Sequence, residues 1–98
     1  MMFRKYRLIH QNSNIELPDG KFVIGRSTNC HLVLDDPSIS RVHAIITLTK
    51  NGLFIEDQRS RNGVNVNSVV TTGRVKLEDG DRITLGHQTL RVQVAEDT

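Results

Sequence analysis

Three polar segments of this sequence combine residue types that bind phosphate and hold an extended peptide. The first begins with Gly25-Arg26, the second contains Ser40-Arg41-Val42-His43, and the third is Ser60-Arg61-Asn62-Gly63. Arginine suits a phosphate because its planar guanidinium donates several hydrogen bonds and keeps its charge. A serine hydroxyl adds a neutral donor, and an asparagine amide can both donate to and accept from a peptide backbone. Arg26, Ser40 and Asn62 would form a phosphopeptide site if the fold gathers their loops at one end, which spacing alone does not establish.

The elements that must position these segments are predicted to be short β-strands. Leu90, Val92 and Val94 alternate with polar residues, and so do the apolar residues of the segment 41–49, where Val42 and Ala44 share one face. Shorter candidates occur at 6–10, 14–17, 21–25, 31–34, 53–56, 64–66, 74–77 and 82–85. Turn signals such as Asn51-Gly52 separate them, and no window is typical of an amphipathic helix. About ten short strands indicate an all-β fold, an antiparallel sandwich or barrel.

Length and composition limit the function classes. At 98 residues, positions 1–98 are expected to form a single domain, either a whole protein or a module of a longer one. The formal net charge of +2 and the three Phe, one Tyr and no Trp argue against a nucleic-acid binder. The single cysteine, Cys30, offers neither a disulfide nor a zinc spacing. No apolar run is long enough for a signal peptide or a membrane span, so we expect a cytoplasmic protein, or a nuclear one in a eukaryote. The apolar pattern indicates no contiguous apolar surface, so we expect a monomer.

Neither catalysis nor metal binding finds support in the pattern. His10, His31 and His87 lack metal-ligand spacing, and the pair Asp35-Asp36 is a weak calcium signal without further spaced ligands. His43 has no matching nucleophile and carboxylate, and we interpret it as a hydrogen-bonded loop anchor. We therefore predict no enzyme activity, no cofactor and no metal.

The three polar segments and a fourth block together resemble the signature of the forkhead-associated (FHA) family. The fourth block is the run 77–86, in which a Gly-Asp turn precedes an apolar strand and a glycine. The match spans essentially the whole chain, with the four blocks in the family's order and approximate spacing. The resemblance implies an eleven-strand β-sandwich whose loops at one end bind a phosphothreonine peptide.

The resemblance also implies a role for each motif residue. Arg26 would bind the phosphate and Ser40 would donate a hydrogen bond to it, while Arg41 stands where family members often carry a second phosphate contact. Asn62 would hold the peptide main chain. Gly25, His43 and Gly63 would support the site structurally.

The third loop departs from the family pattern at one position. Many members have Ser-Thr-Asn-Gly there, whereas this chain has Ser60-Arg61-Asn62-Gly63. Ser60 and Arg61 would lie near the pocket for the threonine methyl group. Arg61 would either add a contact to a phosphate or an acidic side chain, or point to solvent.

The leading hypothesis is a phosphothreonine-dependent binding module for signalling. Its partner would be a phosphothreonine-containing protein or peptide, such as a Ser/Thr kinase or its substrate, and neither nucleic acid nor a membrane. The alternative is a constitutive interaction module that uses a sandwich face or an edge strand independently of phosphorylation.

Overall fold

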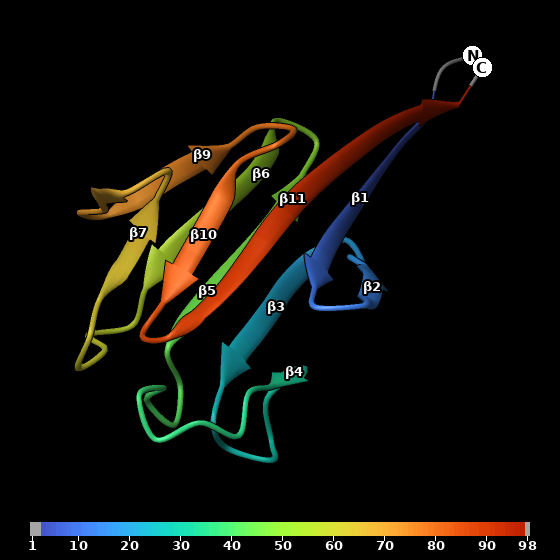
Figure 1. The fold of residues 1–98 in the computed structure, drawn as a ribbon. Coiled ribbons are helices and arrows are strands. Elements are labelled where there is room, and N and C mark those ends of the chain that lie inside the picture. Colours follow the sequence, from blue (N-terminus) through green and yellow to red (C-terminus); the bar gives the residue numbers. More distant parts are fainter. Residues whose placement is uncertain (1–2, 98) are drawn as a thin grey trace.

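The computed structural model describes residues 3–97, and the regular structure in this range consists of β-strands (Figure 1). The strands in chain order are β1 (Phe3–His10), β2 (Ser13–Glu16), β3 (Gly20–Gly25), β4 (Leu32–Val33), β5 (Ala44–Thr49), β6 (Gly52–Asp57), β7 (Val64–Val66), β8 (Val69–Val70), β9 (Arg74–Leu77), β10 (Arg82–Leu85) and β11 (Gln88–Asp97). Between residues 3 and 97 there is no helix with the length and apolar character needed to cross a membrane.

Two sheets form the fold. The six-stranded sheet has the order β2-β1-β11-β10-β7-β8, and the five-stranded sheet has the order β4-β3-β5-β6-β9. Neighbouring strands pair antiparallel, except that β4 runs parallel to β3. The predicted all-β sandwich is confirmed, and so are the eleven strands that the family resemblance implies. The one strand that the apolar pattern did not indicate is β8, which contains only two residues.

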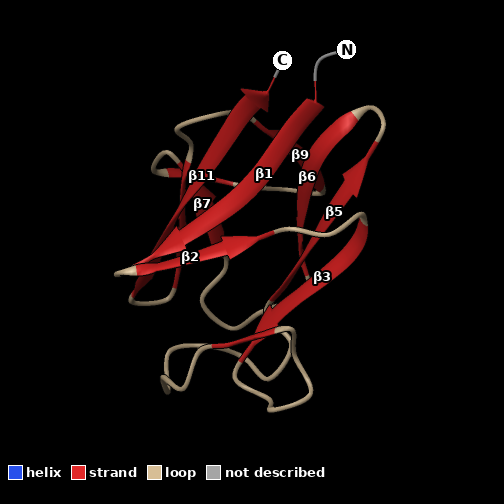
Figure 2. Ribbon diagram, turned by 90° about the vertical axis from the view of Figure 1, so that its right-hand side faces the viewer, coloured by secondary structure: helices blue, strands red, loops and turns tan. Residues whose placement is uncertain are grey.

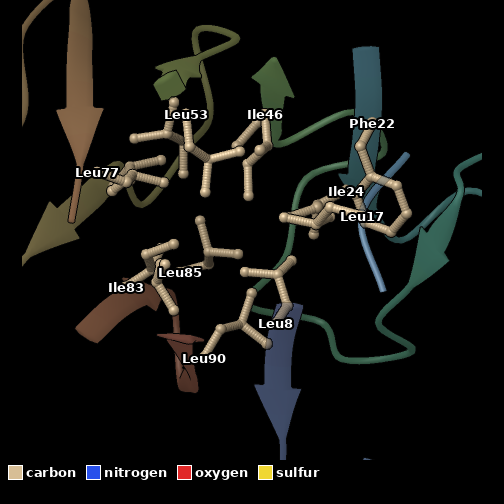
Figure 3. Close-up of a cluster of buried hydrophobic side chains, with 14 of the residues drawn as sticks. Leu8, Leu17, Phe22, Ile24, Ile46, Leu53, Leu77, Ile83, Leu85 and Leu90 are labelled. Atoms are coloured by element: carbon tan, nitrogen blue, oxygen red, sulfur yellow. The ribbon is translucent and has the colours of Figure 1, made fainter. Parts of the chain in front are cut away.

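The inward-facing side chains of both sheets form one apolar core. In Figure 3, Ile46 and Leu53 of the five-stranded sheet lie opposite Leu8, Leu85 and Leu90 of the six-stranded sheet. Each of these five side chains is at most 1% exposed. Burying a side chain of this size stabilises the fold by about 1.5–3 kcal/mol. Because successive side chains of a strand point to opposite faces, the alternating apolar residues of each strand all lie on the inner face of its sheet.

The strand predicted over 41–49 is shorter in the structure, because β5 begins at Ala44. Val42, which we expected in the apolar row of this strand, is instead 44% exposed. The reason is a local turn, in which the backbone N–H of Ser40 donates to Nδ1 of His43 at 3.1 Å. Arg41, Val42 and His43 therefore belong to the loop that precedes β5.

The strand register brings three loops to one end of the sandwich. Ala44, the first residue of β5, pairs with Ile24 near the end of β3 and with Asp57 at the end of β6. The β3–β4 loop (26–31), the β4–β5 loop (34–43) and the β6–β7 loop (58–63) consequently start or finish at the same edge. Figure 2 shows loops gathered at the end below β3, with the two chain termini at the opposite end. Each of the three polar segments predicted from the sequence contributes to this loop-bearing end.

Candidate functional site

His43 is the buried anchor of the loop-bearing end. Its side chain is 0% exposed, and its backbone N–H donates to the carbonyl of Ile24 at 2.9 Å. Nδ1 accepts from the N–H of Ser40, which leaves Nε2 to donate to the carbonyl of Gly63 at 2.8 Å. These two partners require the neutral imidazole with its proton on Nε2. The imidazole therefore ties the β4–β5 loop to the β6–β7 loop, and both ring nitrogens are used in doing so.

Ser40 lies where the three loops meet. Its carbonyl accepts from the N–H of Arg26 at 3.0 Å, and its hydroxyl oxygen accepts from the N–H of Arg61 at 2.9 Å. The side chain is half-buried, and within residues 3–97 its hydroxyl hydrogen has no acceptor. A serine held at both its carbonyl and its hydroxyl oxygen, with the hydroxyl hydrogen still free, is prepared to donate to an incoming anion.

Arg26 follows β3 and extends from the β3–β4 loop into solvent. Its Nε donates to the carbonyl of the buried Ile39 at 3.0 Å, which fixes the direction of the guanidinium group. In the described part of the chain its terminal NH2 groups have no hydrogen-bond partner and no carboxylate lies within 4.0 Å. Arg26 and Ser40 thus offer a charged donor group and a neutral donor that are linked through one backbone hydrogen bond.

Asn62 is exposed, and one of its amide hydrogens is already used. Nδ2 donates to the carbonyl of Ser38 at 2.8 Å, which links the β6–β7 loop to the β4–β5 loop a second time. The amide oxygen accepts no hydrogen bond within residues 3–97. An amide oriented in this way can accept from a peptide N–H and donate its second hydrogen to a peptide carbonyl.

The two glycines and Ser60 shape the loop backbones. A Cβ at Gly25 would collide with the carbonyl oxygen of Arg41, so only glycine allows β3 and the β4–β5 loop to approach this closely. Gly63 has φ +76°, a conformation that favours glycine. The hydroxyl of Ser60 accepts from the N–H of Gly63 at 2.9 Å, and its own N–H donates to Asp57 at 3.1 Å. The Ser60 hydroxyl oxygen is therefore used as an acceptor within its own turn.

Arg41 and Arg61 present their side chains to solvent. Both residues are exposed, and neither guanidinium group makes a hydrogen bond or ion pair with residues 3–97. Their backbones, in contrast, are fixed. The carbonyl of Arg41 accepts from the N–H of Ser27 at 3.1 Å and from Cys30 Sγ at 3.2 Å, while the N–H of Arg61 donates to Ser40.

Ser38 supports the site through buried hydrogen bonds, although the sequence motifs predict no role for it. Ser38 is only 9% exposed, and its hydroxyl oxygen accepts from the N–H of His87 at 2.9 Å. Its own N–H donates to Asp36 at 2.8 Å, and Gln88 donates to the same carboxylate at 2.6 Å. The hydroxyl and N–H of Ser38, followed by Gln88, lower the pKa of Asp36 to about 2. The sequence Asp36-Pro37-Ser38 is typical of an Asx turn and could have indicated this local part.

The FHA domain family model matches residues 22–86, which contain all three site loops. This chain belongs to the FHA family. The loops that carry Arg26, Ser40 and Asn62 lie within the matched range, and hydrogen bonds to Ser38 and Ser40 join them.

One relative, EmbR, illustrates the similarity in both sequence and structure. The transcriptional regulatory protein EmbR of Mycobacterium tuberculosis is 37% identical over 75 residues, covering 76% of this chain and 19% of EmbR. The structure of M. tuberculosis EmbR in complex with a low-affinity phosphopeptide has a TM-score of 0.90 at 31% identity, covering 96% of this chain and 25% of that one. This chain thus spans about a fifth of the length of EmbR.

A third similarity extends over nearly the whole of both chains. A structure solved in work on phosphothreonine-dependent FHA domain interactions has a TM-score of 0.86 at 29% identity, and the match covers 91% of this chain and 95% of the other. The sandwich of this chain therefore has the fold of an FHA domain.

Proposed function

We propose that this FHA domain binds phosphothreonine peptides through the loops that meet at Ser40. The observation that carries the proposal is the geometry of Arg26 and Ser40, which are joined by a 3.0 Å backbone hydrogen bond and both keep donors that residues 3–97 leave unused. The similarity to a structure solved in work on phosphothreonine-dependent FHA domain interactions and to EmbR in complex with a low-affinity phosphopeptide supports the same chemistry. We propose residues 1–98 as one such domain, acting alone or within a longer protein.

The phosphate would be held by charge-assisted hydrogen bonds. A phosphothreonine carries about 1.5 to 2 negative charges and three acceptor oxygens. The free NH2 groups of Arg26 supply a planar pair of donors, and the hydroxyl of Ser40 supplies a neutral one. Arg41, next to Ser40 in the chain, carries a further guanidinium group without a partner among residues 3–97.

The peptide main chain would be held by Asn62. Its amide is oriented by the bond to the Ser38 carbonyl and keeps both an acceptor and a donor for an extended backbone. Ser60 and Arg61, adjacent to Asn62, would border the threonine side chain, while Gly25, His43 and Gly63 support the loops. Each charge-assisted bond contributes about 1.5–3 kcal/mol. After the cost of ordering the peptide, we expect a Kd near the micromolar range, which corresponds to a binding free energy of about −8 kcal/mol.

The partner would be a phosphorylated protein, such as a Ser/Thr kinase or its substrate. Members of the FHA family are in general binding modules, and we propose that this chain also acts by binding and not by catalysis. We expect it to act in the cytoplasm, or in the nucleus of a eukaryote, where ATP-dependent kinases produce phosphothreonine. A constitutive interaction module, the alternative function, gives no reason for exposed arginines around Ser40 that form no ion pair with residues 3–97.

Calorimetric titration of the domain with degenerate threonine peptide pools tests the proposal. We expect the phosphothreonine pool to bind, and the unphosphorylated pool not to bind. Arg26→Ala should remove most of the affinity while the thermal unfolding midpoint stays within a few degrees of the wild type. Arg91→Ala is the matched control, because Arg91 is an exposed arginine of β11 in the six-stranded sheet. Equal binding of both pools, or wild-type affinity in Arg26→Ala, would contradict the proposal.

A further inference from the structure

The loop-bearing end carries more free positive charge than one phosphate contact needs. Arg26, Arg41, Arg59 and Arg61 are all exposed and come from the three site loops. None of the four guanidinium groups has a carboxylate within 4.0 Å among residues 3–97. Residues 3–97 do contain an ion pair between Arg4 and Glu96. It joins the start of β1 to the end of β11, beside the chain termini and away from the loop-bearing end (Figure 1).

The acidic residues of the same loops do not neutralise these arginines. Asp36 accepts hydrogen bonds from the N–H of Ser38 and from Gln88, and Asp57 accepts from the N–H of Ser60. Asp35 is exposed and forms no ion pair with the described residues. Two carboxylates thus stabilise turns, and the arginine charges remain available to a ligand.

Arg59 and Arg61 occupy one turn of the β6–β7 loop. The backbone of Arg59 has φ +53°, in the left-handed region. Glycine adopts this conformation readily and asparagine and aspartate do so less often, whereas it is unfavourable for the other residues. A long cationic side chain at such a position gives the backbone no advantage, which suggests that its charge is used. The N–H of Arg61 donates to the Ser40 hydroxyl oxygen, so the backbone of Arg61 lies directly beside the residue that is predicted to contact the phosphate.

We propose that Arg59 and Arg61 bind a second anionic group on the peptide, close to the phosphothreonine. The inference rests on the proposed function, since it requires the phosphothreonine to be held at Arg26 and Ser40. The second group would be the carboxylate of an acidic residue or a second phosphate, because both accept hydrogen bonds from a guanidinium group in the same planar geometry. This makes the two arginines determinants of specificity, and the domain a reader of acidic or multiply phosphorylated segments.

Fluorescence anisotropy with four peptides of one length tests this inference. The first has a phosphothreonine flanked by alanines, the second has one added glutamate near it, the third has a second phosphothreonine instead, and the fourth has its glutamate at the far end of a long neutral spacer. We expect the nearby glutamate to strengthen binding about two- to fivefold, as an exposed ion pair does. The second phosphate should strengthen it further, and both gains should shrink as salt is raised.

Variants assign the effect to the two arginines. Arg59→Asn removes the charge while asparagine tolerates the left-handed backbone, and Arg61→Gln keeps a side chain of similar reach. In the double variant, the second and third peptides should bind no more tightly than the alanine-flanked peptide, so the readout is the ratio of the affinities measured with the same protein. Arg91→Ala should retain that preference.

The outcomes separate this inference from the proposed function. If the alanine-flanked phosphothreonine peptide binds but the added anions give no gain, or if the gain survives in the double variant, the inference is wrong and the proposed function stands. If no phosphothreonine peptide binds, both are wrong. A gain with only one of the two anions identifies which of them the arginines recognise.

Discussion

The N–H of Arg61 donates a 2.9 Å hydrogen bond to the hydroxyl oxygen of Ser40, and this bond joins two loops through residues that are 21 positions apart in the chain. Because the acceptor is the hydroxyl oxygen, the hydroxyl hydrogen remains available. The same side chain can therefore hold the β6–β7 loop and donate to a ligand. The position of the β6–β7 loop and the contact to a ligand therefore both depend on the hydroxyl group of Ser40.

Replacing Ser40 by alanine should affect binding more strongly than stability. The variant lacks a donor to a charged phosphate, which is worth about 1.5–3 kcal/mol or roughly 10- to 150-fold in Kd. It also leaves the Arg61 N–H without its acceptor, which we expect to cost about 1 kcal/mol of unfolding free energy. Peptide titration measures the first effect and urea denaturation the second. A Ser40→Ala domain with unchanged Kd would show that the hydroxyl does not contact the phosphate.

His43 should be the most sensitive of the site residues for stability. Replacement by alanine removes a fully buried side chain and leaves the N–H of Ser40 and the carbonyl of Gly63 without partners. We expect a loss of about 3 kcal/mol of unfolding free energy, from the cavity and the unpaired groups. Denaturant unfolding checks this value. His31→Ala provides the comparison: His31 is exposed in the β3–β4 loop, its Nδ1 accepts from the Val23 N–H at 2.9 Å and its ring stacks on Phe22, so this variant should lose some stability but less than His43→Ala. A loss in His43→Ala no larger than in His31→Ala would contradict the anchoring role.

Gly25 should tolerate no side chain. A Cβ there would collide with the Arg41 carbonyl oxygen and lie 2.9 Å from Cys30 Sγ, so Gly25→Ala must displace the β4–β5 loop. We expect it to cost about 1–3 kcal/mol of stability, the range for overpacking, and to weaken phosphopeptide binding as well. Gly80→Ala provides the comparison, because Gly80 has φ +86° but open space around it. That variant should lose about 1 kcal/mol through backbone strain and keep its affinity.

Much of this site could be predicted because its chemistry lies in short contiguous segments. Residue types and family motifs predict Arg26, Ser40 and Asn62 as binding residues, and the structure brings their loops to one end because the register of β5 aligns the ends of β3 and β6. The alternation of apolar residues likewise indicated the strands and the core, since strand side chains alternate between the two faces.

The contacts that could not be predicted join residues far apart in the chain. Ser38 binds His87 across 49 residues, and Asp36 binds Gln88 across 52, so no local pattern reveals that the β10–β11 turn supports the site. Val42 was assigned to a strand because it fits the alternation, but the His43 side chain turns the backbone before the strand begins. The first kind of contact is hidden by distance in the sequence, whereas in the second case a local side-chain hydrogen bond overrides the apolar alternation.

Asp36 should make the stability of the domain sensitive to acid. Hydrogen bonds from the hydroxyl and N–H of Ser38 and from Gln88 hold the pKa of its carboxyl at about 2, below the ordinary 3.8. Because the folded state has the lower pKa, the carboxylate stabilises it fully above about pH 4, and this contribution is lost as the pH falls from about 4 towards 2. Urea denaturation at several pH values should therefore show a falling midpoint in that window for the wild type. In Asp36→Asn, the midpoint at pH 7 should be lower and the fall below pH 4 smaller, whereas Asp35→Asn should follow the wild-type profile because Asp35 is exposed and forms no ion pair with residues 3–97. An equally steep fall in Asp36→Asn would assign the acid sensitivity to other carboxylates.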